Sequence, residues 1–286
     1  MKKKFLFLIF FLTLFSSHSF GELSFVQTKD VTSDTPGVRG INFKPDGKIM
    51  YITSRLKDSE DAYVVQYSLS TPFDISTATR SFNDGDGTQL ACSTNMKLPH
   101  AIEFKPDGTK MFVATNKDFS GNPGVAIFQF KLTTAWDSST LVCEKIYEVK
   151  EAGVYVENQL RTLAFKPDGT RMFVGGMTLD KIRQFDLSNA WDLRSGVTPG
   201  EISDSLVTSD TSMRNIQFNS DGTALYIAGD TNARMNKYTL STAYDITTLS
   251  STFSTFDLGS RVNDMRGFIF AANFTKLFVT SDKETA

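Results

Sequence analysis

The chain has 286 residues, of which 40% are hydrophobic and 22% charged, and its formal net charge is −2. This length suits one large all-β domain or two domains of ordinary size. The nearly balanced charge argues against a nucleic-acid-binding surface as the main role, so no nucleic-acid partner is expected.

Residues 1–21 have the pattern of a secretory signal peptide, which we call the leader. Three lysines near the start precede an apolar stretch at 5–15 and a short segment of small and polar residues. The apolar stretch is too short for a membrane-spanning helix, and cleavage is expected after Gly21, or alternatively after Ser19. No cysteine follows the apolar stretch in the leader, so no lipoprotein anchor is expected. The mature chain, 22–286, is therefore expected to be secreted or periplasmic without a membrane span, an uncleaved N-terminal anchor being the other reading.

Five copies of one pattern recur along the mature chain. Three read Phe-Lys-Pro-Asp-Gly, one reads Phe-Asn-Ser-Asp-Gly, and the last is eroded to Phe-Ala-Ala-Asn-Phe. The copies begin at Phe43, Phe104, Phe165, Phe218 and Phe270. A strand-rich repeat of roughly 40–60 residues is typical of a propeller or another repeat array. We therefore expect residues 22–286 to form one domain.

The third repeat shows what one unit contains. Strands are predicted at 160–165, 171–174, 181–187 and 201–208, from alternating apolar residues and the turns between them. A Lys-Pro-Asp-Gly turn joins the first two strands, and a second turn with an aromatic-Asp pair follows the third. Four antiparallel strands per unit predict an all-β fold, a β-propeller with four full blades and a partial fifth.

The hairpin Phe-x-Pro-Asp-Gly-x-x-Met-(Phe/Tyr)-(Val/Ile) resembles the repeat of TolB-type and YVTN/lactonase-like propellers. The later Leu-Ser-x-x-aromatic-Asp turn resembles that of secreted bacterial repeat proteins of the same broad group. The resemblance begins near Val38 and continues to the C-terminus. It implies the propeller fold, whereas such families include lactone hydrolases, periplasmic scaffolds and surface proteins. No catalytic residue carries over, because the shared motif is a turn.

The two ends of the chain are expected to meet. Residues 24–32 stand where the fourth strand of a preceding blade would stand, and propellers often close by sharing strands between the termini. The fifth unit supplies strands at 265–270 and 276–280 and then ends at Ala286, so its third strand is missing. Two explanations stay open, a truncated chain or a ring that closes with an abbreviated fifth blade.

A basic residue stands four positions before each repeat phenylalanine. These residues, which we call the basic ring, are Arg39, His100, Arg161, Arg214 and Arg266. Each starts the innermost strand of its blade, on the face that also carries the variable loops between strands two and three and between blades. Cations around the mouth of the central channel would attract carboxylate, phosphate or sulfate groups, which arginine binds bidentately. An anion site on this variable face is therefore one interpretation of the basic ring.

The structural alternative is that nearby acids neutralise the arginines. Three acids stand close before ring arginines, at Glu157, Asp210 and Asp264. His100 is the only histidine of the predicted mature chain, which excludes a zinc site with several histidines from one chain. A serine–histidine–aspartate triad would have to use His100, and the chain has no Gly-x-Ser-x-Gly motif.

The sequence also offers a candidate disulfide and a candidate calcium site. Cys92 and Cys143 are the only cysteines, and an oxidising compartment would permit a disulfide between them. No cofactor is expected, although Asp84 and Asp86 lie in an oxygen-rich loop that could hold calcium. The aromatic-Asp turns could stack on sugars, but their recurrence in every complete unit favours packing.

The expected function is a secreted, non-catalytic propeller that binds a protein or an anionic small molecule or glycan on its variable face. This expectation rests on the lack of a recognisable catalytic constellation. The alternative is a lactonase-like or other hydrolase that uses carboxylates and the basic ring, and a purely structural envelope or adhesion role is third. An enzyme should place acids beside the ring at the axis, whereas a scaffold should expose an apolar patch on that face.

Overall fold

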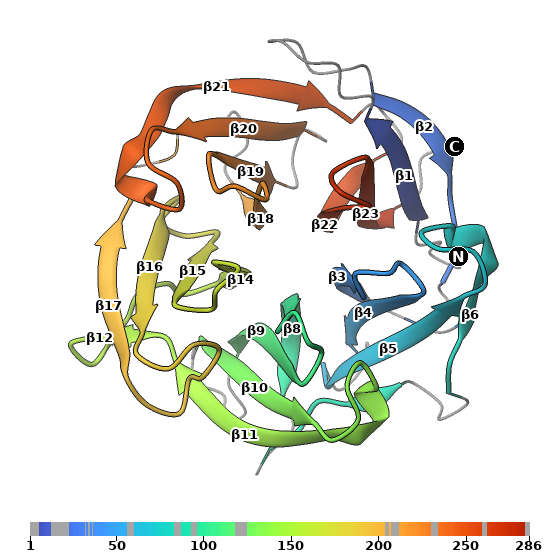
Figure 1. The fold of residues 1–286 in the computed structure, drawn as a ribbon, viewed down its shortest axis with the longest axis horizontal. Helices are drawn as coiled ribbons and strands as arrows, with labels where there is room; N and C mark the ends of the chain where they lie inside the picture. Colours follow the sequence, from blue (N-terminus) through green and yellow to red (C-terminus); the bar gives the residue numbers. More distant parts are fainter. Residues whose placement is uncertain are drawn as a thin grey trace.

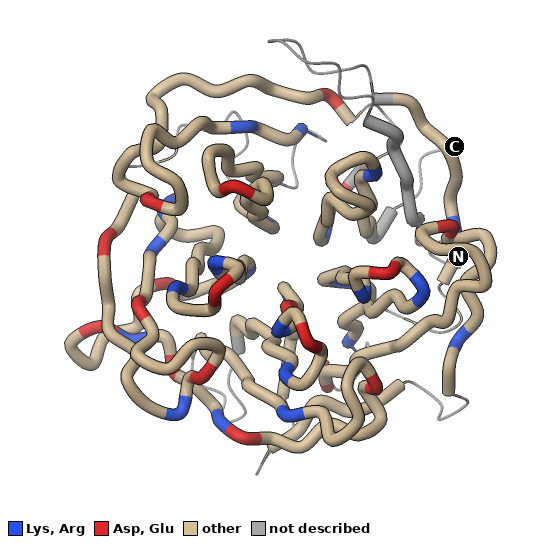
Figure 2. The backbone as a smooth tube through the Cα atoms, in the orientation of Figure 1, with Lys and Arg blue, Asp and Glu red and all other residues tan. Residues whose placement is uncertain are grey.

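The computed structural model describes the whole chain apart from residues 1–5, 13–22, 32, 34, 36, 56–59, 83–86, 93–95, 118–124, 204–205, 207–211, 230–233, 259–261 and 284–286. The described part consists of β-strands and short 3-10 turns, with its sheets arranged in a ring (Figure 1). No helix in that part is long and apolar enough to cross a membrane. Acidic and basic positions are interspersed around the blades (Figure 2).

Four blades are built from strands that follow one another in the chain. Blade 1 contains β3 (Val38–Phe43), β4 (Ile49–Arg55), β5 (Ala62–Leu69) and β6 (Ala78–Arg80), and β7 (Thr88–Gln89) also pairs with β5. Blade 2 contains β8 (Lys97–Phe104), β9 (Lys110–Lys117), β10 (Ala126–Leu132) and β11 (Leu141–Glu148). Blade 3 contains β14 (Leu160–Phe165), β15 (Arg171–Gly176), β16 (Ile182–Leu187) and β17 (Val197–Ile202). Blade 4 contains β18 (Met213–Phe218), β19 (Ala224–Gly229), β20 (Arg234–Leu240) and β21 (Leu249–Asp257). Between blades 2 and 3 lies a hairpin of β12 (Lys150–Glu151) and β13 (Val154–Tyr155).

The predicted fold class, an all-β propeller with four-stranded antiparallel blades, is confirmed. In the third repeat the fourth strand differs most from the expectation, since it was expected at 201–208 and β17 instead runs from Val197 to Ile202. Residues 204–205 and 207–208 of the expected strand lie outside the described residues. The strand begins early because the chain turns back at Gly196, whose carbonyl accepts a hydrogen bond of 2.9 Å from the Ser188 N–H. This turn places Val197 opposite Leu187.

The fifth sheet contains strands from both ends of the chain. Its order is β22 (Asn263–Ala271), β23 (Lys276–Lys283), β1 (Leu6–Leu12) and β2 (Leu23–Gln27). The expectation that an N-terminal strand becomes the outer strand of the last blade is confirmed by β2. The expectation that the third strand is missing differs from the structure, in which part of the predicted leader fills that place. A short, wholly apolar run suits a strand buried on both faces as well as it suits a leader.

The hydrophobic core lies between the blades. Each repeat phenylalanine contacts an aromatic ring from the second strand of the neighbouring blade. The ring-centroid distances are 4.4 Å for Phe43–Phe278, 4.4 Å for Tyr51–Phe104, 4.7 Å for Phe112–Phe165, 4.7 Å for Phe173–Phe218 and 4.6 Å for Tyr226–Phe270. Because every contact between adjacent blades has such a pair, the whole ring is the folding unit.

The two turns of a blade pack against each other on one face of the ring, which we call the turn face. In blade 3 the Trp191 N–H donates to the Gly169 carbonyl (3.0 Å), and the Trp191 ring lies 4.8 Å from that of Phe165. Trp191 adopts a left-handed φ of 60°, and Phe73, Trp136 and Tyr244 do the same in the other blades. The recurring aromatic residue is thus used in packing.

A disulfide joins the outer parts of blades 1 and 2. Cys92 follows β7 and Cys143 lies in β11, and their Cα atoms are 5.2 Å apart. The bond crosses a separation of 51 residues. It therefore ties the outermost strand of blade 2 to the segment that leads out of blade 1.

Candidate functional site

The basic ring lies at an irregularity that recurs in all five inner strands. The register shifts between Val38 and Ile41 in β3 and between Pro99 and Ile102 in β8. The corresponding shifts in β14, β18 and β22 lie at Leu160/Thr162, Met213/Asn215 and Met265/Gly267. A bulge of this kind re-aims a side chain away from the regular pleat. Each of the five basic residues stands within one of these shifts.

Four of the five ring residues come together around one imidazole. Arg161 Nη1 contacts Nε2 of the His100 ring and lies 3.1 Å from Nδ1 of the same ring. Arg39 and Arg214 lie close enough for their charges to act on the same imidazole. His100, Arg39 and Arg214 are buried, with 2%, 5% and 7% of their surface exposed. Basic residues from four blades therefore make up a basic cluster at this imidazole, with Arg161 in contact and Arg39 and Arg214 acting through their charges.

The imidazole in this cluster is neutral. Burial is the largest cause that lowers the pKa of His100 well below its ordinary value, followed by the charges of Arg161, Arg39 and Arg214. A hydrogen bond with Asn116 acts in the opposite direction and is outweighed. A guanidinium only donates hydrogen bonds, so a neutral ring nitrogen is the acceptor that Arg161 requires.

Neutral groups and threonines from the second strands hold the ring in place. Arg39 Nη1 donates to the Val38 carbonyl (2.6 Å), and Arg161 Nη2 donates to Gln159 Oε1 (3.0 Å). Behind them, the Thr53 hydroxyl donates to the His100 carbonyl (2.8 Å). The Thr280 hydroxyl likewise donates to the carbonyl of Arg39 (2.5 Å). The backbone beneath the cluster is thereby fixed by the neighbouring strand.

The predicted neutralising acids behave differently from one another. Asp264 forms the expected ion pair with Arg266, at 2.7 Å between Oδ2 and Nη2. Glu157 instead accepts hydrogen bonds from backbone N–H groups, including those of Asn158 (2.8 Å) and Gln159 (3.0 Å). Asp210 lies outside the described residues. The fifth ring position is therefore held by its own acid, and Glu157 serves the backbone instead of the cluster.

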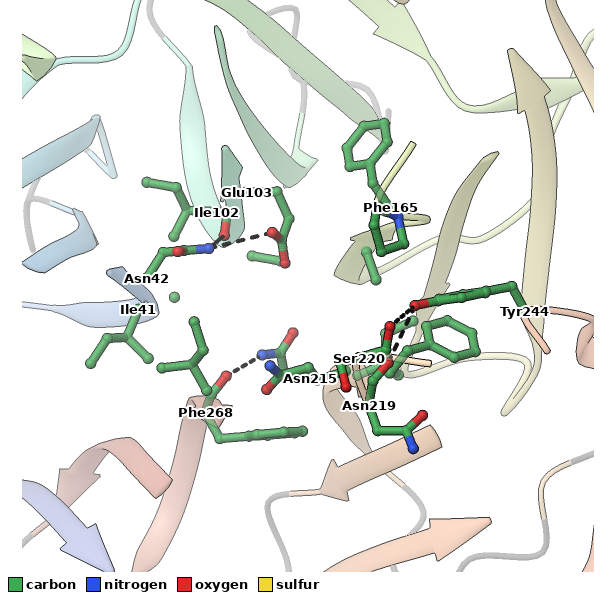
Figure 3. A pocket seen from close by; sticks show the side chains of 18 residues that line it. Ile41, Asn42, Ile102, Glu103, Phe165, Asn215, Asn219, Ser220, Tyr244 and Phe268 are labelled. Carbon is green, nitrogen blue, oxygen red and sulfur yellow. Dashed lines mark hydrogen bonds between the residues drawn. The ribbon is translucent and has the colours of Figure 1, made fainter. Parts of the chain in front are cut away.

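A cavity of about 220 Å³ lies in the central channel, bounded by all five inner strands and by turn-face residues of blades 3 and 4 (Figure 3). Amide side chains on its wall bind neighbouring blades. Asn42 Nδ2 donates to the Ile102 carbonyl (2.9 Å), and Asn215 Nδ2 donates to the Phe268 carbonyl (2.7 Å). Gln217 Nε2 donates to the Phe270 carbonyl (3.0 Å), and Gln217 Oε1 accepts a hydrogen bond from the Phe270 N–H (2.7 Å). The cavity wall thus combines amide side chains, most of which have structural partners, with apolar side chains such as Ile41 and Phe268.

One acid, Glu103, projects into this cavity from β8. Its Oε2 lies 3.4 Å from Asn42 Nδ2, a long hydrogen bond (Figure 3). Burial raises the pKa of Glu103 to about 8, and the Asn42 bond lowers it only in part. Glu103 therefore carries a proton at neutral pH, on the same strand as His100.

Sequence reasoning missed this acid. The position before each repeat phenylalanine lines the channel cavity, and it carries Asn42, Glu103, Ala164, Gln217 and Ile269. Three of these five residues are polar and two are apolar, so the position has no motif that would have singled out Glu103 in the sequence.

An apolar hollow lies on the variable face of blade 3. It has a volume of about 40 Å³ and is lined in part by Leu179 and Ile202, which are 52% and 39% exposed. Exposed aliphatic side chains beside a hollow are the feature expected of a scaffold. The structure thus shows an apolar patch on the variable face and an acid deeper in the channel.

The calcium candidates Asp84 and Asp86 lie outside the described residues. Among the residues that are described, no group of three or more histidine, cysteine or acidic side chains could hold a metal ion.

Comparisons with known proteins give a fold and no family. No protein-family model matches the chain. No curated protein matches it in sequence. The periplasmic gluconolactonase PpgL of Pseudomonas aeruginosa superposes with a TM-score of 0.51 at 12% identity, over 97% of this chain and 76% of its own.

Two other solved structures are similar. A Bacteroides fragilis protein, provisionally assigned as a 6-phosphogluconolactonase, gives a TM-score of 0.46 at 18% identity, over 89% of this chain and 67% of its own. A chain of the nidogen/laminin complex superposes with a TM-score of 0.49 at 12% identity, over 92% of this chain and 81% of its own. Lactonase-like propellers are thus structural neighbours, and at such low identity the likeness establishes the fold alone. The resemblance to TolB-type propellers stays a prediction.

Proposed function

We propose that the protein is a secreted or periplasmic, non-catalytic β-propeller that binds an anionic ligand at the basic ring. The observation that carries the proposal is the convergence of Arg39, Arg161 and Arg214 on the neutral His100. Three guanidinium groups around one uncharged imidazole create a positive potential in a partly enclosed mouth. An anion there would gain charge-assisted hydrogen bonds where water is scarce.

The chemistry of the ring favours planar or tetrahedral oxyanions. Arginine binds carboxylate, phosphate and sulfate with two parallel hydrogen bonds, which a lysine cannot do. The ligand is therefore a carboxylate, phosphate or sulfate group on a small molecule, a glycan or a protein partner. The apolar hollow at Leu179 and Ile202 on the same face suits the less polar part of a larger partner.

A thermal-shift series tests the proposal. The protein is heated with sugar acids, inorganic phosphate, inorganic sulfate, sulfated glycans or lactones, and with calcium as a separate arm. Only a ligand that binds the native state raises the melting midpoint. We expect an anion-specific rise that Arg161→Ala and Arg214→Ala both abolish.

Arg194→Ala is the matched control, because Arg194 is 55% exposed and pairs with Asp192 away from the ring. It should keep the full ligand response. If no anion raises the midpoint, or if Arg194→Ala loses the response equally, the ring is structural and the proposal is wrong.

A hydrolase is the second candidate, and one observation favours it. Glu103 lies in the channel cavity with a raised pKa, as a general acid would. Lactone hydrolysis that Glu103→Gln abolishes, with the anion response kept, would support this activity. Hydrolysis that is undetectable in the unmodified protein would reject it.

A further inference from the structure

The third place in blade 5 is filled in a way that no other blade shares. Strand β1 pairs antiparallel with β23 over six residue pairs, from Leu6 opposite Ser281 to Phe11 opposite Lys276. On its other side it pairs antiparallel with β2, with Phe10 opposite Phe25. The segment belongs to the predicted leader, so cleavage after Gly21 would remove it and leave a space one strand wide.

Both walls of this space are held by contacts that do not involve β1. Strand β2 is tied to blade 1, where Gln27 Nε2 donates to Asp74 Oδ1 (3.0 Å). Nearby, Lys29 Nζ donates to the Ala78 carbonyl (2.9 Å). On the opposite wall, β23 pairs with β22 and packs on blade 1 through Phe278. Removing the leader therefore exposes two strand edges that face each other.

We propose that the space between β23 and β2 is a β-strand acceptor site, filled by an extended segment of a partner protein once the leader has been removed. The inference rests on leader cleavage and is independent of ligand binding at the basic ring. An open edge carries unsatisfied backbone donors and acceptors, and a strand seated between two edges satisfies both of its own sides.

The full blades specify the sequence of the incoming strand. In each full blade, the third strand has an exposed polar residue that pairs with the first residue of the second strand. An aromatic residue precedes this polar residue, and a leucine follows it. The triplets are Tyr67-Ser68-Leu69, Phe130-Lys131-Leu132, Phe185-Asp186-Leu187 and Tyr238-Thr239-Leu240. In blade 5 the same register gives Phe10-Phe11-Leu12.

The leader therefore matches the aromatic and leucine positions and departs at the middle one. That middle position is exposed in every full blade. The partner segment should be at least six residues long, free of proline, apolar on both faces, and should end in an aromatic-polar-leucine triplet. Such a segment would fit the site better than the leader does.

The experiment uses the full chain with a protease recognition sequence inserted after Leu14. After folding, the chain is cut, and a fluorescent peptide of residues 1–12 is titrated while anisotropy is recorded. We expect saturable binding to the cut chain and none to the uncut chain, whose site is filled covalently. The Phe11→Lys peptide should bind at least as well, and the Phe10→Lys peptide at least about tenfold more weakly.

A second measurement reports the register. A peptide with Phe11→Cys should form a disulfide with the Lys276→Cys protein, and a peptide with Phe7→Cys should not. If the cut chain aggregates, peptide added before cutting must prevent this.

The proposal is overturned if the cut chain takes up no peptide or binds the Phe10→Lys peptide as tightly as the Phe11→Lys peptide. Aggregation that peptide cannot prevent, or a dimer of the cut chain that peptide cannot dissociate, would overturn it as well.

Discussion

At the scale of single residues, the channel contains two titratable groups whose pKa values are shifted in opposite directions, and each shift favours the uncharged form of the side chain. His100 stays neutral because it is buried among arginines. Glu103 stays protonated because desolvation inside the channel raises its pKa to about 8. Each group resists the charge that water would give it, so each links folding to pH.

The His100 contribution should weaken the protein in acid. The unfolded chain binds a proton below the ordinary pKa of 6.5, whereas the folded chain does not, so stability falls as pH drops below that value. Between pH 7.5 and pH 5, His100→Gln should lose about 2 kcal/mol less unfolding free energy than the unmodified protein. Urea unfolding at both pH values measures this, and parallel losses in the two proteins would contradict it.

Glu103 makes the stability of the protein depend on pH in the opposite direction. The folded chain keeps the proton up to about pH 8, whereas the unfolded chain releases it near the ordinary value of 4.5, so stability falls across that interval as pH rises. Glu103→Gln should therefore be more stable than the unmodified protein by about 4–5 kcal/mol at pH 9, since each pKa unit of that interval corresponds to about 1.4 kcal/mol. At pH 5 the two should differ little, which serves as the internal control for denaturant titrations.

At the scale of elements, the turn hairpins depend on a glycine beneath an aromatic ring. Gly169 has a φ of +73°, and a Cβ there would lie 2.0 Å from Trp191 Cδ1. Gly153, in the β12–β13 hairpin, has a φ of +81° with nothing within 4 Å of the same position. A side chain at Gly153 would only strain the backbone, whereas a side chain at Gly169 would also clash with Trp191.

Gly153→Ala should therefore cost about 1 kcal/mol of unfolding free energy, and Gly169→Ala about 3 kcal/mol or more. The second substitution must displace Trp191 as well as strain the backbone. Near-ultraviolet circular dichroism should change with Gly169→Ala alone. Equal losses of stability in both variants would show that the aromatic contact does not contribute.

At the scale of the whole molecule, stability comes from contacts between blades, and the disulfide adds a covalent one. Cys92 and Cys143 join segments of adjacent blades and close a long loop. A loop of this length restricts the unfolded chain, and such bonds typically contribute about 2–4 kcal/mol.

The Cys92→Ser, Cys143→Ser double variant should lose about 2–4 kcal/mol in equilibrium unfolding. Reduction of the unmodified protein with dithiothreitol should lower its melting midpoint to that of the double variant. The double variant itself should not respond to the reductant. A midpoint that reduction leaves unchanged would show that the bond adds nothing to global stability.

The sequence alone predicted the features that each repeat encodes by itself. The repeat phenylalanine, the Asp-Gly turn and the basic ring all follow from aligning one repeat on the next. Glu103 could not be found in this way, because its environment is built by four other inner strands. The third strand of blade 5 was missed for a related reason, since the apolar run at its position also satisfies the pattern of a leader.

The closing contact between blades 5 and 1 has a consequence for when the protein can fold. The Thr280 hydroxyl reaches the Arg39 carbonyl across 241 residues, and Phe278 meets Phe43 in the same contact. The core of blade 1 is therefore incomplete until β23 packs against it. Contacts so distant along the chain make folding slow. The ring can therefore close only after β23 is present, so its closure belongs to a late stage of folding.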